Sequence, residues 1–216
     1  IFYFFENITS QTRVLILIGG LFLFLTLEFG IPFFKSPYNK LSHAKINISF
    51  TLITLIINLF GAVGILKSVE FVRAYNFGLL NAIETPLWLY TLIGIALMDF
   101  FGAWFIHWIQ HNVKWMWKFH IIHHSDPNVD VTSGLRHHPG ENIFRLFFTI
   151  LAILISGANF GLVMIYQTVS VFFAHFSHAN IRLPEKIEYF VSFIFVTPRF
   201  HRIHHHFMQP YTDSNY

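Results

Sequence analysis

Long apolar stretches alternate with short polar links in the first half of this chain. The stretches run from Val14 to Phe34, from Ile46 to Leu66, and from Pro86 to Ile106. Each has the ~20 residues that an α-helix needs to cross a bilayer. The pattern therefore predicts three membrane-spanning helices. The mixed segment between the second and the third, which carries Lys67, Glu70, Arg73 and Glu84, predicts an interfacial helix.

The second half of the chain shows a different apolar pattern. The stretch from Ile143 to Phe173 is 31 residues long, and Gly157, Ala158, Asn159 and Gly161 interrupt its middle. Each half has about 15 residues, which is short for a complete span. We therefore expect a hairpin of two short, tilted or half-buried helices, which returns the chain to the side that it left. The apolar stretch from Glu188 to Thr197 is too short to cross and is predicted to lie along the interface.

Composition supports a membrane location. The chain is 54% hydrophobic and only 12% charged, whereas soluble domains contain about 25% charged residues. We predict an all-α integral membrane helical bundle that forms one domain, residues 1–216. Within it, residues 1–85 contain the N-terminal spans and linker, and residues 86–216 contain the histidine-rich region. The sequence begins at Ile1 without methionine and ends at Tyr216, and we expect both ends to be trimmed.

Charge and cysteine usage exclude several classes of partner and site. The net charge is +3 and the basic residues are scattered, so a nucleic acid partner is not expected. The chain contains no cysteine, which excludes disulfides, thiolate metal sites and an iron–sulfur cluster held by this chain. Any bound metal must therefore have nitrogen and oxygen ligands. The oligomeric state cannot be predicted from these features.

The basic residues also predict an orientation. Under the positive-inside rule, the link between the first two spans is cytosolic because it contains Lys35, Lys40 and Lys45. The third span then ends on the same side, as do Lys114, Lys118 and Arg136. Only Lys67 and Arg73 contradict this orientation. We expect the histidine-rich region at the cytosolic face of a bacterial inner membrane or the endoplasmic reticulum, where four tryptophans form an interfacial belt: Trp104, Trp108, Trp115 and Trp117.

The distribution of histidines is the strongest chemical signal. Ten of the fourteen occur at i, i+3 or i, i+4 spacing in four segments: His107 and His111; His120, His123 and His124; His175 and His178; His201, His204 and His205. Residues at this spacing lie on one face of a helix. His43 has no such partner, and we expect it to have no role in the histidine site.

Ten imidazoles on helix faces predict a metal site. Clustering them without a partner buries many polar nitrogens at a cost in free energy, and a metal offsets this cost because neutral imidazole is a good ligand. One ion takes three or four protein ligands, so ten fit a dinuclear site. Imidazole binds zinc, copper, iron and nickel alike, and the spacing does not select among them.

Five groups of residues, taken together and in their order along the chain, resemble those of a known protein family. They are Asp99 with "WFIHWIQH" at 104–111, "WKFHIIHHS" at 117–125, "NVDVTSGLRHHPGE" at 128–141, "HFSHAN" at 175–180 and "TPRFHRIHHH" at 197–206. Together they resemble the fatty acid hydroxylase and sterol desaturase superfamily of membrane enzymes. The resemblance covers Asp99 to Tyr216, which is more than half of the chain.

The resemblance implies a non-haem di-iron centre that uses dioxygen to hydroxylate or desaturate a C–H bond of a lipid. Zinc is a possible substitute for iron. The implied ligands are the ten spaced histidines, with His138 as a further ligand or as a residue that orients one. No nicotinamide-binding glycine pattern occurs, so we expect a separate electron-transfer protein. A sterol, a fatty acyl chain, an ether lipid and a carotenoid all remain open as the substrate.

Several polar residues near the histidines have two interpretations each. Asp99 lies two turns before His107 and either orients a ligand or is a buried helix partner. Asn180 either orients a ligand or caps a helix. Arg136 and Glu141 are expected to pair and to cap the helix that starts near Pro139. His137 and His206 have no assigned role.

Two alternative functions use the same imidazoles. A zinc-dependent membrane lipid hydrolase would use zinc to activate water. Such an enzyme needs an open coordination position on the zinc and a general base, and it does not need ten ligands. A histidine-rich metal transporter would bury its ligands within the spans. Here the histidines gather at the ends of the spans, which disfavours transport.

Overall fold

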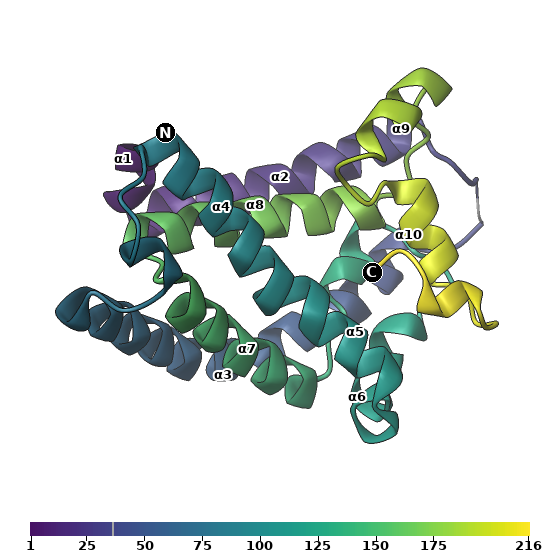
Figure 1. Cartoon of the computed structure of the whole chain (residues 1–216). Helices are drawn as coiled ribbons and strands as arrows, with labels where there is room; N and C mark the ends of the chain where they lie inside the picture. Colours follow the sequence, from purple (N-terminus) through teal and green to yellow (C-terminus); the bar gives the residue numbers. More distant parts are fainter. Residues whose placement is uncertain (36) are drawn as a thin grey trace.

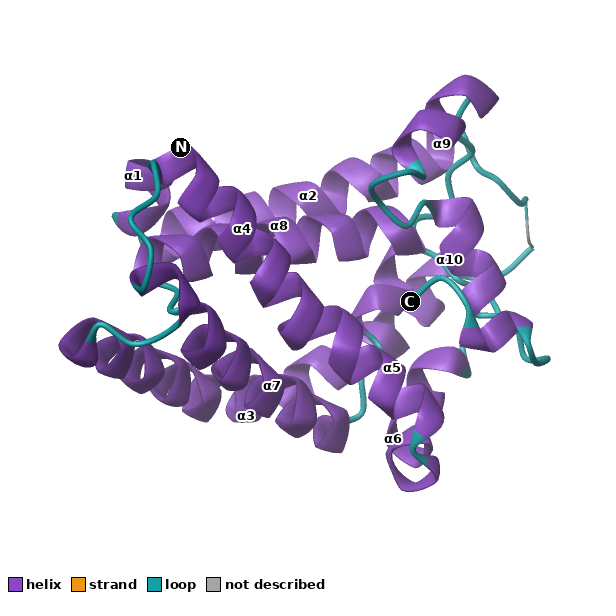
Figure 2. Cartoon of the chain, viewed as in Figure 1, coloured by secondary structure: helices purple, strands orange, loops and turns teal. Residues whose placement is uncertain are grey.

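The computed structural model describes residues 1–35 and 37–216, and every regular element among them is a helix (Figure 2). The α-helices are α1 (Phe2–Glu6), α2 (Ser10–Gly30), α3 (Lys40–Tyr75), α4 (Leu87–Asp99), α5 (Phe105–Asn112), α6 (Lys114–His124), α7 (Pro139–Ser156), α8 (Phe160–His178), α9 (Glu185–Val191) and α10 (Pro198–His204). Shorter elements are the 3₁₀ turns η1 (Leu79–Asn81), η3 (Val131–Leu135) and η4 (Tyr211–Asp213), and the π-helical η2 (Phe100–Trp104).

Five helical segments are long and apolar enough to cross a membrane: 10–30, 40–81, 87–112, 139–156 and 160–178. Their outer faces carry large apolar side chains, such as Leu59 and Phe60 on α3, which are 69% and 72% exposed. In water such a surface would be unfavourable, whereas lipid tails cover it without loss. The chain is an integral membrane helical bundle, as the sequence predicts.

Helix α3 differs from its prediction. Instead of a span from Ile46 to Leu66 followed by a separate interfacial helix, one 36-residue helix continues to Tyr75. Three of the four charged residues of that segment, Lys67, Glu70 and Arg73, lie on its exposed surface, where Lys67 Nζ lies 2.7 Å from Glu70 Oε2. Because this i, i+3 pair is compatible with helical geometry, the charges do not end the helix. It ends at Asn76, which adopts a left-handed conformation with φ 48°.

The predicted hairpin is present, with longer helices than expected. Helices α7 and α8 have 18 and 19 residues and are separated by residues 157–159. Gly157 ends α7 at φ 77°, and Asn159 caps α8 by accepting a hydrogen bond from the Leu162 backbone at 3.0 Å. A Cβ on Gly78 would lie 2.3 Å from Gly157 Cα. The turn therefore needs glycine both for its left-handed backbone and for this close approach.

The third span contains a π-helical turn between Asp99 and Phe105. This element, η2, packs against α7, and Gly102 brings the backbone close to Ala152 and Tyr166. A single π-helical turn changes the register of the residues that follow it and is frequent at functional sites. The turn precedes His107 and His111, so the direction in which α5 presents them depends on it.

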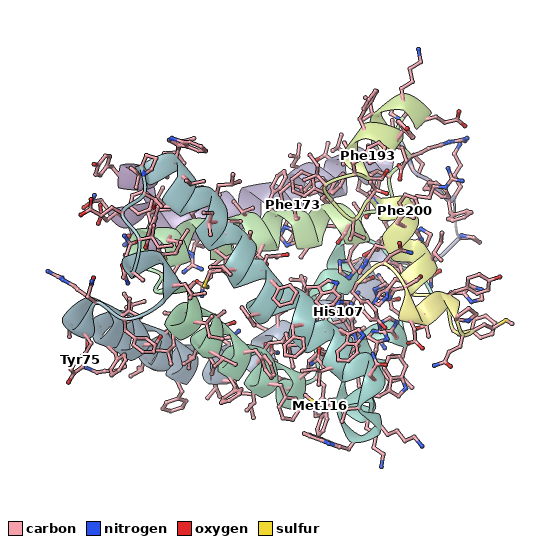
Figure 3. All side chains as sticks on the ribbon, viewed as in Figure 1. Tyr75, His107, Met116, Phe173, Phe193 and Phe200 are labelled. Atoms are coloured by element: carbon pink, nitrogen blue, oxygen red, sulfur yellow. The ribbon has the colours of Figure 1, made fainter. Side chains whose placement is uncertain are left out.

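The histidine-bearing segments gather at one end of the bundle. In Figure 1, α5, α6 and α10 lie at the end of the bundle opposite the C-terminal end of α3. Figure 3 shows His107 far from Tyr75, the last residue of α3. The main core lies among α4, α7 and α8, where Met98, Ala152 and Leu162 are fully buried. Helix α9 projects near the histidine end and exposes apolar side chains such as Phe190, and Phe193 just after the helix is exposed as well. The location of α9 in a membrane interface remains a prediction.

Candidate metal centre

Nine histidines from α5, α6, α8 and α10 with its C-cap form two adjoining groups at this end of the bundle. The five-histidine group consists of His107, His111, His120, His124 and His204, and the four-histidine group consists of His123, His178, His201 and His205. Within each group, one ring nitrogen from every residue lies within 4.8 Å of the others. The groups are in direct contact, because the His124 ring stacks on the His205 ring with centroids 4.5 Å apart.

The repeated His-x-x-His-His spacing explains why there are two groups. On α6, His120 and His124 are four residues apart and join one group, while His123 points to the other. On α10 the order reverses, since His201 and His205 join the four-histidine group and His204 joins the five-histidine group. Three imidazoles spread over an arc of about 100° can thus serve two neighbouring positions.

The distances between ring nitrogens suit a bound ion. Four Nε2–Nε2 distances lie between 3.0 and 3.2 Å, two in each group. Two imidazoles bound to one ion at ~2.1 Å, and ~90° to 109° apart, would have nitrogens roughly 3.0 to 3.4 Å apart. The residues present therefore fit one ion in each group.

Acceptors on the outer nitrogens fix the orientation of five of these rings. His120 Nδ1 lies 3.0 Å from Glu141 Oε1 and His111 Nδ1 lies 3.2 Å from Asp213 Oδ1. The other three rings donate from Nδ1 to a backbone carbonyl oxygen: His123 to that of Arg136, His178 to that of Ala174, and His204 to that of Ser214. A proton held on Nδ1 leaves Nε2 free as a ligand atom, as ligating histidines require.

Burial keeps the rings outside the spans neutral. Desolvation lowers the pKa of His204 to about 4 and places the pKa values of His123, His201 and His205 well below the ordinary value. Charged imidazolium cannot bind a cation, so a neutral ring is the form that ligation needs.

His175 is the one predicted ligand that the structure leaves outside both groups. It lies one helical turn before His178 on α8, and its ring faces α2, where a Cβ on Gly20 would be 3.7 Å from His175 Nδ1. The i, i+3 spacing correctly placed the two residues on neighbouring turns. It did not reveal that the site lies beyond the end of α8, within reach of His178 alone.

The three other predicted site residues make no hydrogen bond to any of the nine histidines within the described part of the chain. Asp99 is exposed on the surface of α4. His138 is the N-cap of α7, where its Nδ1 accepts a hydrogen bond from the Gly140 backbone at 3.0 Å. Asn180 joins two segments by accepting hydrogen bonds from the Phe34 backbone (3.1 Å) and from Arg202 Nη2 (3.2 Å). Their roles in catalysis remain predictions.

Glu141 has a larger role at the site than the sequence suggested. Its Oε1 accepts from Arg145 Nε at 2.8 Å and from His120 Nδ1 and His137 Nδ1 at 3.0 Å. His137 in turn stacks on the ligand candidate His123 with centroids 4.6 Å apart. The expected pairing of Glu141 with Arg136 is wrong: Arg136 donates to the carbonyl of Ile122 at 3.0 Å. The i, i+4 spacing of His137, Glu141 and Arg145 was a signal for this arrangement.

The C-terminal residues contribute contacts that the sequence did not indicate. Asp213 and Ser214 accept from His111 and His204, and the ring of Tyr216 lies with its centroid 5.0 Å from that of His111. These residues cover the five-histidine group on its polar side. Isolated polar residues after the last helix have no periodicity, so no pattern identifies them in advance.

His43 lies outside both histidine groups, as expected, but it has buried partners of its own. It is not isolated, because its Nε2 lies 2.8 Å from Asp126 Oδ1 and its Nδ1 lies 3.1 Å from Asp130 Oδ2. Burial alone raises the pKa of Asp126, yet hydrogen bonds from His43 and Ser133 hold it at about 2. Tyr38 donates to Asp130 at 2.5 Å. This buried network, which lies outside the two histidine groups, ties the start of α3 to the loop that follows α6.

Comparisons with known proteins agree with the geometry. A family model described as fatty acid hydroxylase matches residues 91–216. An ornithine lipid hydroxylase of Rhizobium tropici is 25% identical over 133 residues, which cover 62% of this chain and 39% of the relative. An alkylglycerol monooxygenase of Xenopus tropicalis is 30% identical over 131 residues, which cover 60% of this chain and 27% of the relative. The chain thus spans less than half of each relative, and no solved structure matches it.

Proposed function

Because the chain belongs to the fatty acid hydroxylase family, we propose that it is a membrane oxygenase that oxidises an unreactive C–H bond of a lipid. The observation that carries the proposal is the pair of adjoining groups with five and four histidines. The printed names of the relatives, a lipid hydroxylase and an alkylglycerol monooxygenase, support insertion of oxygen more than desaturation. A zinc hydrolase would need one ion and a general base, and nine converging imidazoles exceed that requirement.

We propose two iron ions as the resident metals, and zinc as a substitute that binds the same nitrogens. When bound, the irons would supply the oxidising chemistry in the overall reaction R–H + O₂ + 2e⁻ + 2H⁺ → R–OH + H₂O. The protein holds the ligands through α5, α6, α8 and α10. Glu141, Asp213 and the backbone acceptors keep Nε2 of five rings directed inward. A separate electron-transfer protein is proposed to deliver the two electrons.

Isotope labelling tests the reaction. Metal-loaded protein with a carrier, a reductase and a nicotinamide donor is expected to consume dioxygen and to place one atom from ¹⁸O₂ in a hydroxylated lipid. A desaturase would consume the gas without labelling the lipid. Turnover without oxygen or electrons, with the label arriving from H₂¹⁸O, would contradict the oxygenase and favour the zinc hydrolase. The control is the same mixture with the metal removed by a chelator.

We further propose that the histidine end of the bundle faces the cytosol. The positive-inside rule supports this side because Lys40 and Lys45 lie at the same end of α3. Single cysteines at Lys114, Arg182 and Gln209 are expected to react with a membrane-impermeant thiol reagent only from the cytosolic side. A cysteine at Glu84, at the far end of the bundle, should react only from the other side. Labelling of Arg182 and Lys114 from opposite sides would contradict the five-span arrangement.

A further inference from the structure

A cavity of about 570 Å³ lies beside both histidine groups. The α2–α3 link, the loop after α6, and α10 form its walls. Among its lining residues are Tyr38, His124, Asp126, Asn180, Arg202 and His205. His124 belongs to the five-histidine group and His205 to the four-histidine group, so a molecule in this cavity lies against one residue of each group.

Apart from histidines, the described residues that line this cavity include one basic residue, Arg202. Its Nη2 donates to Asn180 Oδ1 at 3.2 Å, whereas its buried Nε has no partner within the described residues. The guanidinium lies 5.3 Å from the Phe34 ring centroid and 5.8 Å from that of Phe33. Guanidinium has five N–H donors, so most of its hydrogen-bonding capacity is unused.

The nearby carboxylates form no direct ion pair with Arg202 in the described part of the chain. Glu28 and Asp130 attract its charge at longer range, but each is already bonded to another cation. Asp126 lines the cavity, but its side chain is fully buried and bonded to His43 and Ser133. Asp130 is held by His43 and Tyr38, and Glu28 pairs with Lys40 at 2.8 Å. A half-buried cation without an ionic partner is unfavourable unless a ligand supplies the anion.

We propose that Arg202 binds an anionic oxygen group of the substrate lipid, a phosphate or a carboxylate of its headgroup, in this cavity. Arginine suits such groups because two parallel N–H donors match two oxygen acceptors. The inference rests on the proposed lipid oxygenase and narrows its substrate class to lipids with a phosphate or a carboxylate in the headgroup. It also predicts that the oxidised carbon lies near the headgroup, because the cavity borders the histidines at the end of the spans and not in their middle.

Lipid binding without turnover tests this proposal. The metal-loaded chain in a neutral detergent is titrated with short-chain phosphatidylglycerol, short-chain diacylglycerol or inorganic phosphate, and bound ligand is counted by native mass spectrometry. Wild type is expected to bind phosphatidylglycerol about tenfold more tightly than diacylglycerol, which lacks the phosphate, a difference typical of one lost charge-assisted contact. Arg202→Gln should lose this preference. Arg202→Lys should keep part of it, because it retains the charge but not the paired donors.

The matched control is Arg199→Gln, which removes an exposed arginine from the same helix on the wall of a different cavity. It should bind phosphatidylglycerol as wild type does. Metal content is measured for every variant, and Arg202→Lys decides the question if Arg202→Gln loses metal. Unchanged preference in the Arg202 variants would overturn the proposal, as would binding of inorganic phosphate with no preference for phosphatidylglycerol over diacylglycerol. Because no dioxygen or reductant is present, failure of the oxygenase proposal would appear only in the labelling experiment.

Discussion

Replacement of His124 by alanine is expected to abolish lipid oxidation and to reduce the bound metal from about two ions per chain to about one. His124 Nε2 lies 3.2 Å from His120 Nε2 in the five-histidine group, and its ring stacks on His205 of the other group. The variant therefore removes a ligand and opens the contact between the groups. Loss of one ligand residue from a metal site commonly lowers affinity at least as much as loss of an orienting partner, which costs ~10- to 100-fold.

The matched control is His138→Asn. His138 is also a histidine next to this region, but it caps α7 and contacts Phe119. Asparagine is a good N-cap, so this variant removes an imidazole and preserves the cap. Metal analysis and turnover are measured for both proteins after purification in mild detergent. Equal loss in both variants would contradict the ligand assignment, and circular dichroism would then show whether both proteins misfold or whether His138 also serves the site.

The histidine groups were the part of the site most accessible from sequence. The i, i+3, i+4 spacing of His120, His123 and His124 is local, and a regular helix converts it directly into a shared face. The assignment of these rings to two different groups depends on how α6 and α10 approach each other, which no local pattern records. His175 shows the same limit, because helical spacing gives its direction relative to His178 but not where α8 ends relative to the metal position.

The hydrophobic pattern predicted the spans for a similar reason. Apolar length is a direct consequence of bilayer thickness, so α2, α7 and α8 were recognisable as helices. The charged segment of α3 was misjudged because hydropathy does not distinguish an exposed Lys67–Glu70 pair from a break in the helix. The π-helical turn η2 has no compositional signal, although it precedes the ligand-bearing α5 directly.

The sequence was least informative about buried polar contacts between distant segments. His43 and Asp126 are 83 residues apart, and neither has a charged partner at helical spacing that would mark it. Glu28 likewise accepts hydrogen bonds from the backbones of Val131 and Asn180, both at 2.7 Å. These contacts hold the loops around the cavity of Arg202 in place. They follow from burial, since a carboxylate in a dry interior needs charged or N–H partners.

Replacement of His43 by alanine is accordingly expected to destabilise the protein strongly, an effect that the sequence did not indicate. The imidazole lies between two buried carboxylates, and both ring nitrogens can donate only when the ring is protonated. Its removal leaves Asp126 and Asp130 without their cation, and the loss of one partner from a buried ion pair costs about 3 to 5 kcal/mol. For a chain of this size the loss corresponds to a fall in melting temperature of roughly 6 °C or more.

Thermal unfolding followed by tryptophan fluorescence measures this effect in detergent, with Lys67→Gln as the control. Lys67 also belongs to an ion pair, but both residues of that pair, Lys67 and Glu70, are exposed, with side-chain exposures of 72% and 65%. The free energy of unfolding should therefore change by no more than about 0.5 kcal/mol. A second variant, His43→Gln with Asp126→Asn, replaces the pair by neutral groups and should recover part of the lost stability. A wild-type melting temperature for His43→Ala would show that the network does not hold the loop after α6, and metal content would then be unaffected as well.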